Sequence, residues 1–301
     1  MQTLKLICFV VLSISSSTAA HADGPFRWKF QAGDRLTYSV VQDMNISGSG
    51  GVPAELANKS HQQFDFTWDV ISVSAAGEAT VRLRFDRIRS KMTLPSGGLE
   101  YDSSAKGPAM GMAAINSPLY QALVKSPVEI TISPAGRVMG VRLPPEVLAA
   151  LKRMPTSAAL GDLTKPEAFQ TAFLTGFPIL PLEETVSHGH QWPVKSAAAL
   201  PTAGSPTIET NYFYEGMRDS EGKSVAVIRP VRTISFGVGE SALRAVKEQT
   251  SEGEHLFDVA AGRLQSSTLK HVVVLGGKKG EEGATQTIEQ TIQVRWAPRA
   301  Q

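Results

Sequence analysis

The chain has 301 residues, and its 30 Lys and Arg side chains are nearly balanced by 28 Asp and Glu, which leaves a formal net charge of +2. That balance excludes the usual kind of nucleic-acid partner, because such proteins concentrate a basic excess on one face. The single cysteine, Cys8, lies in the first apolar run, so the rest of the chain has no disulfide, thiolate nucleophile or cysteine-ligated metal.

Residues 1–22 have the form of a secretion signal. Lys5 supplies a positive charge, residues 6–12 are an unbroken apolar run, and Ala20 and Ala22 are the small residues that signal peptidase needs before the cleaved bond. We therefore expect an exported protein, periplasmic or extracellular. No later apolar segment approaches the roughly 20 residues of a membrane span, so the mature chain is expected to be soluble, without a transmembrane span.

The next residues predict half-buried strands joined by hairpin turns. Residues 35–47 alternate between apolar and polar side chains, and so do residues 64–70 and 81–85, which flank a four-residue loop. Folding the second and third strands about that loop pairs Val70 with Val81, Trp68 with Leu83 and Phe66 with Phe85. The same register sets Asp69 opposite Arg82. A slip of one residue would expose the aromatic side chains, so this register is expected to be well specified.

The alternation changes phase near Asp86 and Arg87, which predicts a β-bulge. After this shift, five basic side chains share one polar face: Arg82, Arg84, Arg87, Arg89 and Lys91. They could form a ridge that docks anionic lipid head groups or cell-wall polymer. The other interpretation is a solvated strand face neutralised by nearby aspartates, with charges that discourage edge aggregation.

The middle of the chain is more helical. Ser117 and Pro118 predict a helix start. After a hairpin of residues 128–132 and 137–143, residues 145–154 and 166–175 predict two further short helices. Met110 and Met112 lie in an apolar loop before the first helix. Flexible thioethers adapt to apolar ligands, and they also fill gaps in ordinary cores.

The remainder returns to strands, over residues 208–214, 224–236, 257–259, 263–275 and 287–296. Residues 134–138 and 260–264 are nearly the same Ala-Gly-Arg turn phrase. We therefore expect a single β-rich domain over residues 23–301, either undivided or made of two half-repeats, 23–181 and 182–301.

No segment carries a recognisable catalytic motif. Residues 237–242 fit a G-x-G-x-x-A dinucleotide pattern, but Pro230 in the preceding strand and the surrounding hairpins argue against a nucleotide fold. His188 and His190 could approach a metal, although their spacing suggests no third ligand. We therefore predict no catalytic residue, no cofactor site and no metal site.

Three phrases, at residues 26–38, 180–192 and 257–264, resemble an exported bacterial family of unknown function that is associated with planctomycetes and related bacteria. The resemblance implies no site residues. More loosely, a curved antiparallel sheet with short helices is similar to periplasmic lipoprotein carriers, whose half-barrels hold acyl chains.

Together these patterns predict a mainly β protein: a large curved antiparallel sheet or half-barrel built from hairpins, with about three short helices packed against it. The leading functional hypothesis is a non-enzymatic protein that binds an apolar or amphiphilic small molecule between sheet and helices. The alternative is a structural or interaction module that docks an envelope protein. A hydrolase with dispersed catalytic residues is third.

Overall fold

The computed structural model describes residues 25–50, 57–95, 97–106, 113–154, 162–181, 183, 185–197, 207–236, 245–276 and 283–297. Within these ranges the protein is mainly β, with one antiparallel sheet of 12 strands and three helices. The predicted fold class is confirmed, and the sheet is open rather than closed into a barrel. The predicted signal segment, with Ala20 and Ala22, lies outside the described residues.

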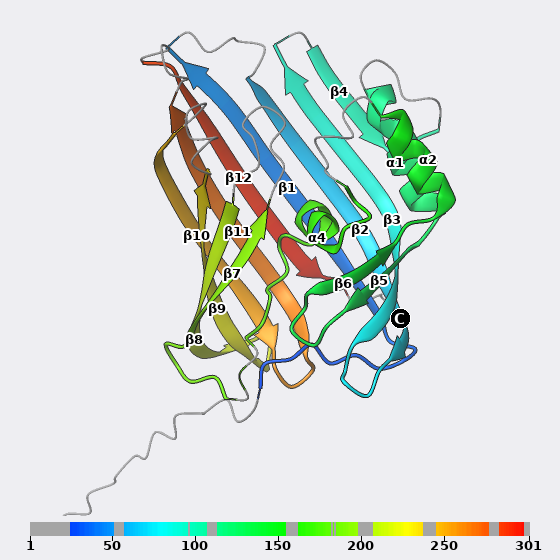
Figure 1. Cartoon of the computed structure of the whole chain (residues 1–301), viewed down its shortest axis with the longest axis vertical. Helices are drawn as coiled ribbons and strands as arrows, with labels where there is room; N and C mark the ends of the chain where they lie inside the picture. The colour runs from blue at the N-terminus through cyan, green and yellow to red at the C-terminus, as the bar shows by residue number, and fades with distance from the viewer. Residues whose placement is uncertain are drawn as a thin grey trace, which may run out of the picture.

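The elements follow one another as β1 (Arg35–Ser49), β2 (Asn58–Val73), β3 (Ala79–Leu94), β4 (Gly97–Asp102), α1 (Ala113–Lys125), β5 (Val128–Ile132), β6 (Val138–Arg142), α2 (Pro145–Arg153), α4 (Pro166–Phe173), β7 (Gln191–Ala197), β8 (Thr207–Ser220), β9 (Lys223–Ser235), β10 (Val246–Asp258), β11 (Arg263–Gly276) and β12 (Thr285–Trp296). Across the sheet the order is β6-β5-β3-β2-β1-β12-β11-β10-β9-β8-β7, and β4 also pairs with β3. Strands β1 and β12 therefore lie side by side in the middle of the sheet (Figure 1). The proposed division into half-repeats stays a prediction.

The β2–β3 hairpin has the predicted register. Trp68 lies opposite Leu83 and Phe66 opposite Phe85, and the register shifts where Asp86 is bulged out between Phe85 and Arg87. The inward side chains are buried, because each large apolar side chain contributes roughly 1.5–3 kcal/mol when it leaves water. Asp69 lies opposite Arg82 as predicted.

The carboxylate of Asp69, however, makes its ion pairs elsewhere. Its Oδ1 lies 2.6 Å from Nε of Arg35 on β1, and its Oδ2 lies 3.4 Å from Nη1 of Arg84. Arg35 lies directly opposite Asp69 on β1, and the long side chain of Arg84 reaches Asp69 from a diagonal position on β3, so Arg82 is not the only available partner. The register therefore follows the apolar pairs, and the ion pairs adapt to it.

The sheet curls until its two edges approach the same helix. Strands β6 and β7 lie at opposite ends of the strand order, yet both contact α4, which lies in front of β1 and β2 in Figure 1. Gln170 of α4 satisfies the edge of β6: its Oε1 accepts the Val138 N–H at 3.1 Å, and its Nε2 donates to the carbonyl of Gly136. The helix thus covers a strand edge that would otherwise be unpaired.

All three helices lie where the sequence predicts helices, and both α2 and α4 have proline at the first turn, where no N–H is needed. Helix α1 begins earlier than predicted, so Pro118 lies inside it rather than at its start. Alanines 113 and 114 favour helix, which accounts for the extra turn. No helix within the described ranges has the length and apolar character needed to cross a membrane.

An aromatic cluster fills the curl between α4 and the first strands. Phe177 lies at its centre, with ring centroids 5.2 Å from Trp68 and 5.1 Å from Tyr38. Trp28 joins this cluster from the segment that precedes β1, and it stacks against Phe30. Aromatic contacts of this kind add about 0.5–1.5 kcal/mol each to the burial of their area. This side of the curl is consequently filled by side chains.

Candidate ligand-binding site

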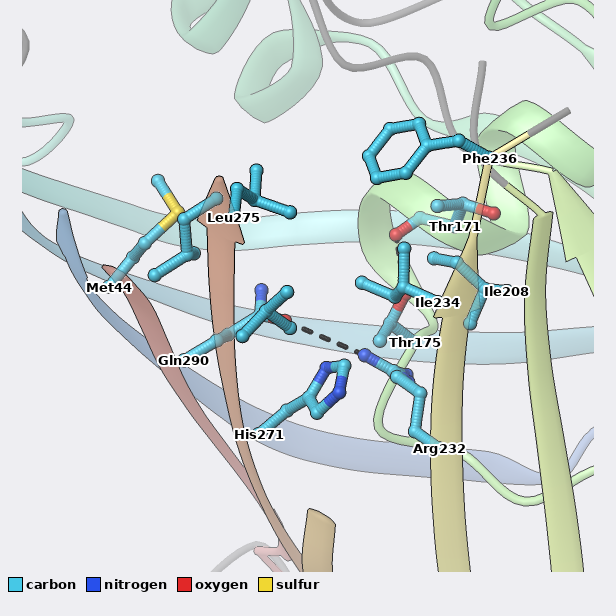
Figure 2. A pocket seen from close by; sticks show the side chains of 12 residues that line it. Met44, Thr171, Thr175, Ile208, Arg232, Ile234, Phe236, His271, Leu275 and Gln290 are labelled. Carbon is cyan, nitrogen blue, oxygen red and sulfur yellow. Dashed lines mark hydrogen bonds between the residues drawn. The ribbon is translucent and has the colours of Figure 1, made fainter. Parts of the chain in front are cut away.

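The other side of the curl contains a cavity of about 220 Å³. Its walls come from β1, β12 and β11 on one side and from β8 and β9 on the other, with α4 and the residues that follow it above (Figure 2). The lining residues are Met44, Thr171, Thr175, Ile208, Arg232, Ile234, Phe236, His271, Val273, Leu275, Ile288 and Gln290.

The β9 residues that line the cavity lie beyond the point where β9 and β10 stop pairing. Their register holds for only three residue pairs, of which His255 opposite Ile228 is the last. Pro230 follows on β9 and has no N–H to donate. Gly253 on β10 lies so close to Pro230 that a Cβ there would be 2.9 Å from its Cγ. The strands separate at this point, where Pro230 has no N–H to donate and Gly253 has no side chain.

Beyond this point, side chains replace the missing backbone hydrogen bonds. The Arg232 N–H donates to Ser251 Oγ at 2.9 Å. The Ile234 N–H donates to Gln249 Oε1 at 2.8 Å, and Gln249 Nε2 donates back to the Ile234 carbonyl at 3.3 Å. These bridges hold β9 at side-chain distance from β10, so the two strands are separated without leaving the β9 backbone unsatisfied.

The cavity is polar at one end and apolar at the other. Arg232, His271 and Gln290 lie together in Figure 2, and His271 is directly opposite Gln290 in the β11–β12 register. The next inward positions on the same strands are apolar, with Val273 opposite Ile288. Phe236 and Leu275 follow near the ends of β9 and β11. Because side chains repeat every second residue, the cavity changes from polar to apolar in layers.

Arg232 is a buried cation without an acidic partner. Its side chain is 9% exposed, and no carboxylate of a described residue forms an ion pair with it. Its Nη1 donates to Gln290 Oε1 in a long hydrogen bond of 3.5 Å, and its Nε has no hydrogen-bond partner among the described residues. Burial lowers the pKa of Arg232, because the charged form loses its hydration.

Two buried histidines accompany this cation. Burial, and secondarily the charge of Arg232, lowers the pKa of His255 to about 3 and that of His271 to about 4. Both imidazoles are therefore neutral at pH 7, and Nδ1 of His255 and Nε2 of His271 have no hydrogen-bond partner. Of the two histidines only His271 is a lining residue, so the polar end of the cavity offers the positive charge of Arg232 and the unsatisfied Nε2 of His271.

The five residues of the predicted basic ridge all lie on β3: Arg82, Arg84, Arg87, Arg89 and Lys91. Four of them are paired with acids: Arg84 with Asp69 and Asp86, Arg87 with Asp102, Arg89 with Asp65, and Lys91 with Glu100 at 4.0 Å. Hydrogen bonds from Arg87 hold the pKa of the Asp102 carboxyl well below its usual range. Docking of anionic groups on this ridge stays a prediction.

The other candidates are placed as follows. Met110, Met112 and the 237–242 segment lie outside the described residues. His190 Nε2 lies 3.7 Å from Glu183 Oε2, and its ring stacks on Trp192. In the part of the chain that the structure describes, no three His, Cys, Asp or Glu side chains gather as a metal site would require.

Sequence reasoning missed Arg232, His271 and Gln290. The signal that could have found them is the alternation of side chains along each strand. Arg232 is an even number of positions from the inward Ile228 and Ile234, so it points to the same face. His271 shares a face with Leu269 and Val273 in the same way. A polar side chain in an inward series is either a core residue or a ligand contact, and only the separation of β9 from β10 distinguishes them.

Comparison with known proteins gives a likeness of fold. No family model matches this chain, and no curated protein matches it. Among solved structures, one described as lipid-protein interactions in lipovitellin is similar, with a TM-score of 0.51 and 16% sequence identity. The match covers 91% of this chain and 26% of that one, so this chain spans about a quarter of its length. What the two share is the architecture of a large sheet.

Proposed function

We propose that this protein is a non-enzymatic binding protein that holds an amphiphilic small molecule between its curled sheet and α4. The single observation that carries the proposal is the cavity, which passes from a polar layer at Arg232 to an apolar layer at Ile234 and Val273. Binding sites for small molecules are typically apolar clefts with a few polar groups that orient the ligand. The lipovitellin structure, whose title names lipid-protein interactions, has a similar fold and supports the same reading.

The place of action is part of the proposal. The signal-like residues 1–22 favour export, so the ligand would be met in the periplasm or outside the cell. An amphiphile released from a membrane needs a protein that shields its apolar part from water, and a curled sheet with an interior cavity can do this. The predicted export and the shape of the cavity therefore favour the same function.

Hydrolysis is less well supported by the same residues. Ser267 and His255 are opposite each other in the β10–β11 register, and a hydrolase would need a nucleophile and a base within reach of each other. Ser267 Oγ and His255 Nδ1 are both without a hydrogen-bond partner, however, and neither residue lines the cavity. A histidine whose pKa is near 3 is also a weak base at pH 7. These features favour binding.

A neutral fluorescent probe, N-phenyl-1-naphthylamine, tests the proposal. Its emission is expected to rise when it enters the cavity of the purified protein, and 1-octanol is expected to displace it. Ile234→Trp fills the cavity and is expected to weaken probe binding by about tenfold or more, since the apolar volume is lost. Ile71→Trp, at a side chain that is 43% exposed on β2, is the matched control.

Equal binding to the wild-type protein and the Ile234→Trp variant, with both correctly folded, would show that this cavity is not the binding site. Failure of the wild-type protein to bind either the probe or the alcohol would contradict the proposed function itself.

A further inference from the structure

The charge inside the cavity specifies the ligand more narrowly. Among the residues that the structure describes, Arg232 is the only Lys or Arg that lines the cavity, and no Asp or Glu lines it. The more exposed Arg229, three positions earlier on β9, has a different environment. It forms an ion pair with Glu215 and lies over the ring of Phe213. On β9 the outward Arg229 therefore has an acidic partner, whereas the inward Arg232 has none among the described residues.

An unpaired buried cation is costly, because transfer of a charge out of water is repaid only by a partner of opposite charge with good hydrogen-bond geometry. Lysine or histidine in this position could lose a proton, whereas a guanidinium stays charged. Gln290 provides only one long hydrogen bond. The missing partner is therefore an anion, and no described residue of the cavity wall supplies it.

The charge of the groups around Arg232 determines how much negative charge the ligand must carry. The two nearby histidines, His255 and His271, are neutral at pH 7, so the guanidinium is the single positive charge to be balanced. A carboxylate matches this requirement, because its two oxygens accept two parallel N–H donors from one guanidinium. The free Nε of Arg232 and Nε2 of His271 lie at the same end of the cavity (Figure 2).

The apolar layers fix the rest of the ligand. Ile234, Val273 and Ile288 form the walls next to the cation, and Phe236 and Leu275 follow toward the strand ends. The cavity volume is about 220 Å³. This suffices for a head group and a short stretch of chain, and a longer chain would continue past the ends of β9 and β11.

We infer, resting on the proposed function, that the ligand is a single-chain carboxylate amphiphile, with its head group on Arg232 and its chain directed toward Phe236 and Leu275. The polar layer recognises the head group, and the apolar layers accept any chain of suitable width. The cavity therefore selects the charge of the ligand more strongly than the length of its chain.

Isothermal titration calorimetry with five small probes tests the inference: octanoate, 1-octanol, octylammonium, acetate and inorganic phosphate. Octanoate is expected to bind about tenfold or more tightly than 1-octanol, since a charge-assisted pair of hydrogen bonds is added to the same chain burial. Octylammonium, which brings a like charge to Arg232, is expected to bind more weakly than the alcohol. Acetate and inorganic phosphate carry a negative charge without the apolar chain, so they are expected to bind far more weakly than octanoate.

Two variants locate the effect. Arg232→Met keeps the length of the side chain and removes its charge, so octanoate and 1-octanol are expected to bind equally to it. Arg229→Met removes an outward arginine from the same strand and is expected to keep the wild-type preference. Circular dichroism verifies that each variant is folded, and the wild-type comparison of octanoate with 1-octanol needs no variant.

The outcomes separate the two proposals. Equal binding of octanoate and 1-octanol to the wild-type protein would overturn the carboxylate inference and leave the proposed function standing. A preference that survives in Arg232→Met would also overturn it, and so would acetate or phosphate binding as tightly as octanoate. Loss of binding for every chain-bearing probe would contradict the proposed function instead.

Discussion

The two sides of the curled sheet differ in how completely their strands are paired. Strands β1, β2 and β3 pair along most of their lengths, and their inward side chains interlock with Phe177 and Trp28. Strands β9 and β10 pair over three residues and then separate. The first side is filled by aromatic rings and carries its charges outside, in ion pairs. The second contains a cavity and carries a charge inside, so interrupted pairing creates the space in which a charge can meet a ligand.

The largest expected difference is the cost of removing a core side chain. Trp68 on the filled side is 2% exposed and contacts several other rings, so Trp68→Ala is expected to lower the free energy of unfolding by about 3–5 kcal/mol. Ile234→Ala, at the cavity wall, is expected to cost clearly less, because space already lies beside it. Urea unfolding of the ligand-free protein measures both, and similar losses would contradict the distinction.

A smaller effect is expected where the strands separate. A Cβ at Gly253 would lie 2.7 Å from the Thr268 carbonyl and 2.9 Å from Pro230 Cγ, so Gly253→Ala is expected to destabilise the protein by about 1–3 kcal/mol. Gly98→Ala on β4 is the control, since its Cβ would lie at an ordinary 3.9 Å from the nearest atom. Thermal unfolding compares them, and an unchanged melting temperature for Gly253→Ala would show that this close approach is not needed.

A third difference is a dependence of stability on pH that belongs to the cavity side. Unfolded histidines titrate near pH 6.5, whereas burial lowers the pKa of His255 to about 3 and that of His271 to about 4. Between these values the unfolded chain binds more protons, so the free energy of unfolding falls as the pH falls below 6.5. Each histidine is expected to contribute a slope approaching about 1.4 kcal/mol per pH unit.

Urea unfolding between pH 7 and pH 5 measures this slope. His271→Gln is expected to reduce it, and His61→Gln, at an exposed site on β2, serves as the control. A slope that is the same in both variants would show that His271 does not contribute to it.

Sequence patterns predicted those parts of the fold that depend on near neighbours. The register of Trp68 against Leu83 and the bulge at Asp86 both follow from alternation within one hairpin, because a slip would move every side chain to the wrong face. The pairing of β1 with β12 and the approach of both sheet edges to α4 join segments far apart in the chain. No local pattern encodes them.

The candidate site was beyond prediction for a related reason. Pro230 was recognised as unusual for a buried strand, but its effect depends on facing Gly253, which lies on another strand. Arg232 is hydrophilic and would be expected outside, and its inward position follows only from the parity of its neighbours. The binding of an amphiphile could be proposed from the general resemblance, whereas the residues that recognise it required the three-dimensional arrangement.

The segment before β1 links distant parts of the chain. The Trp28 N–H donates to the Pro134 carbonyl and the Lys29 N–H to the Gly262 carbonyl, so one short stretch fastens the two turns whose sequences are nearly the same. Lys29 Nζ also reaches the carbonyl of Ala260, 231 positions away. Chain entropy must be lost to close so long a loop before these contacts can stabilise the chain, and this slows folding. We therefore expect the stretch that is synthesised early to dock late, after β11 has formed.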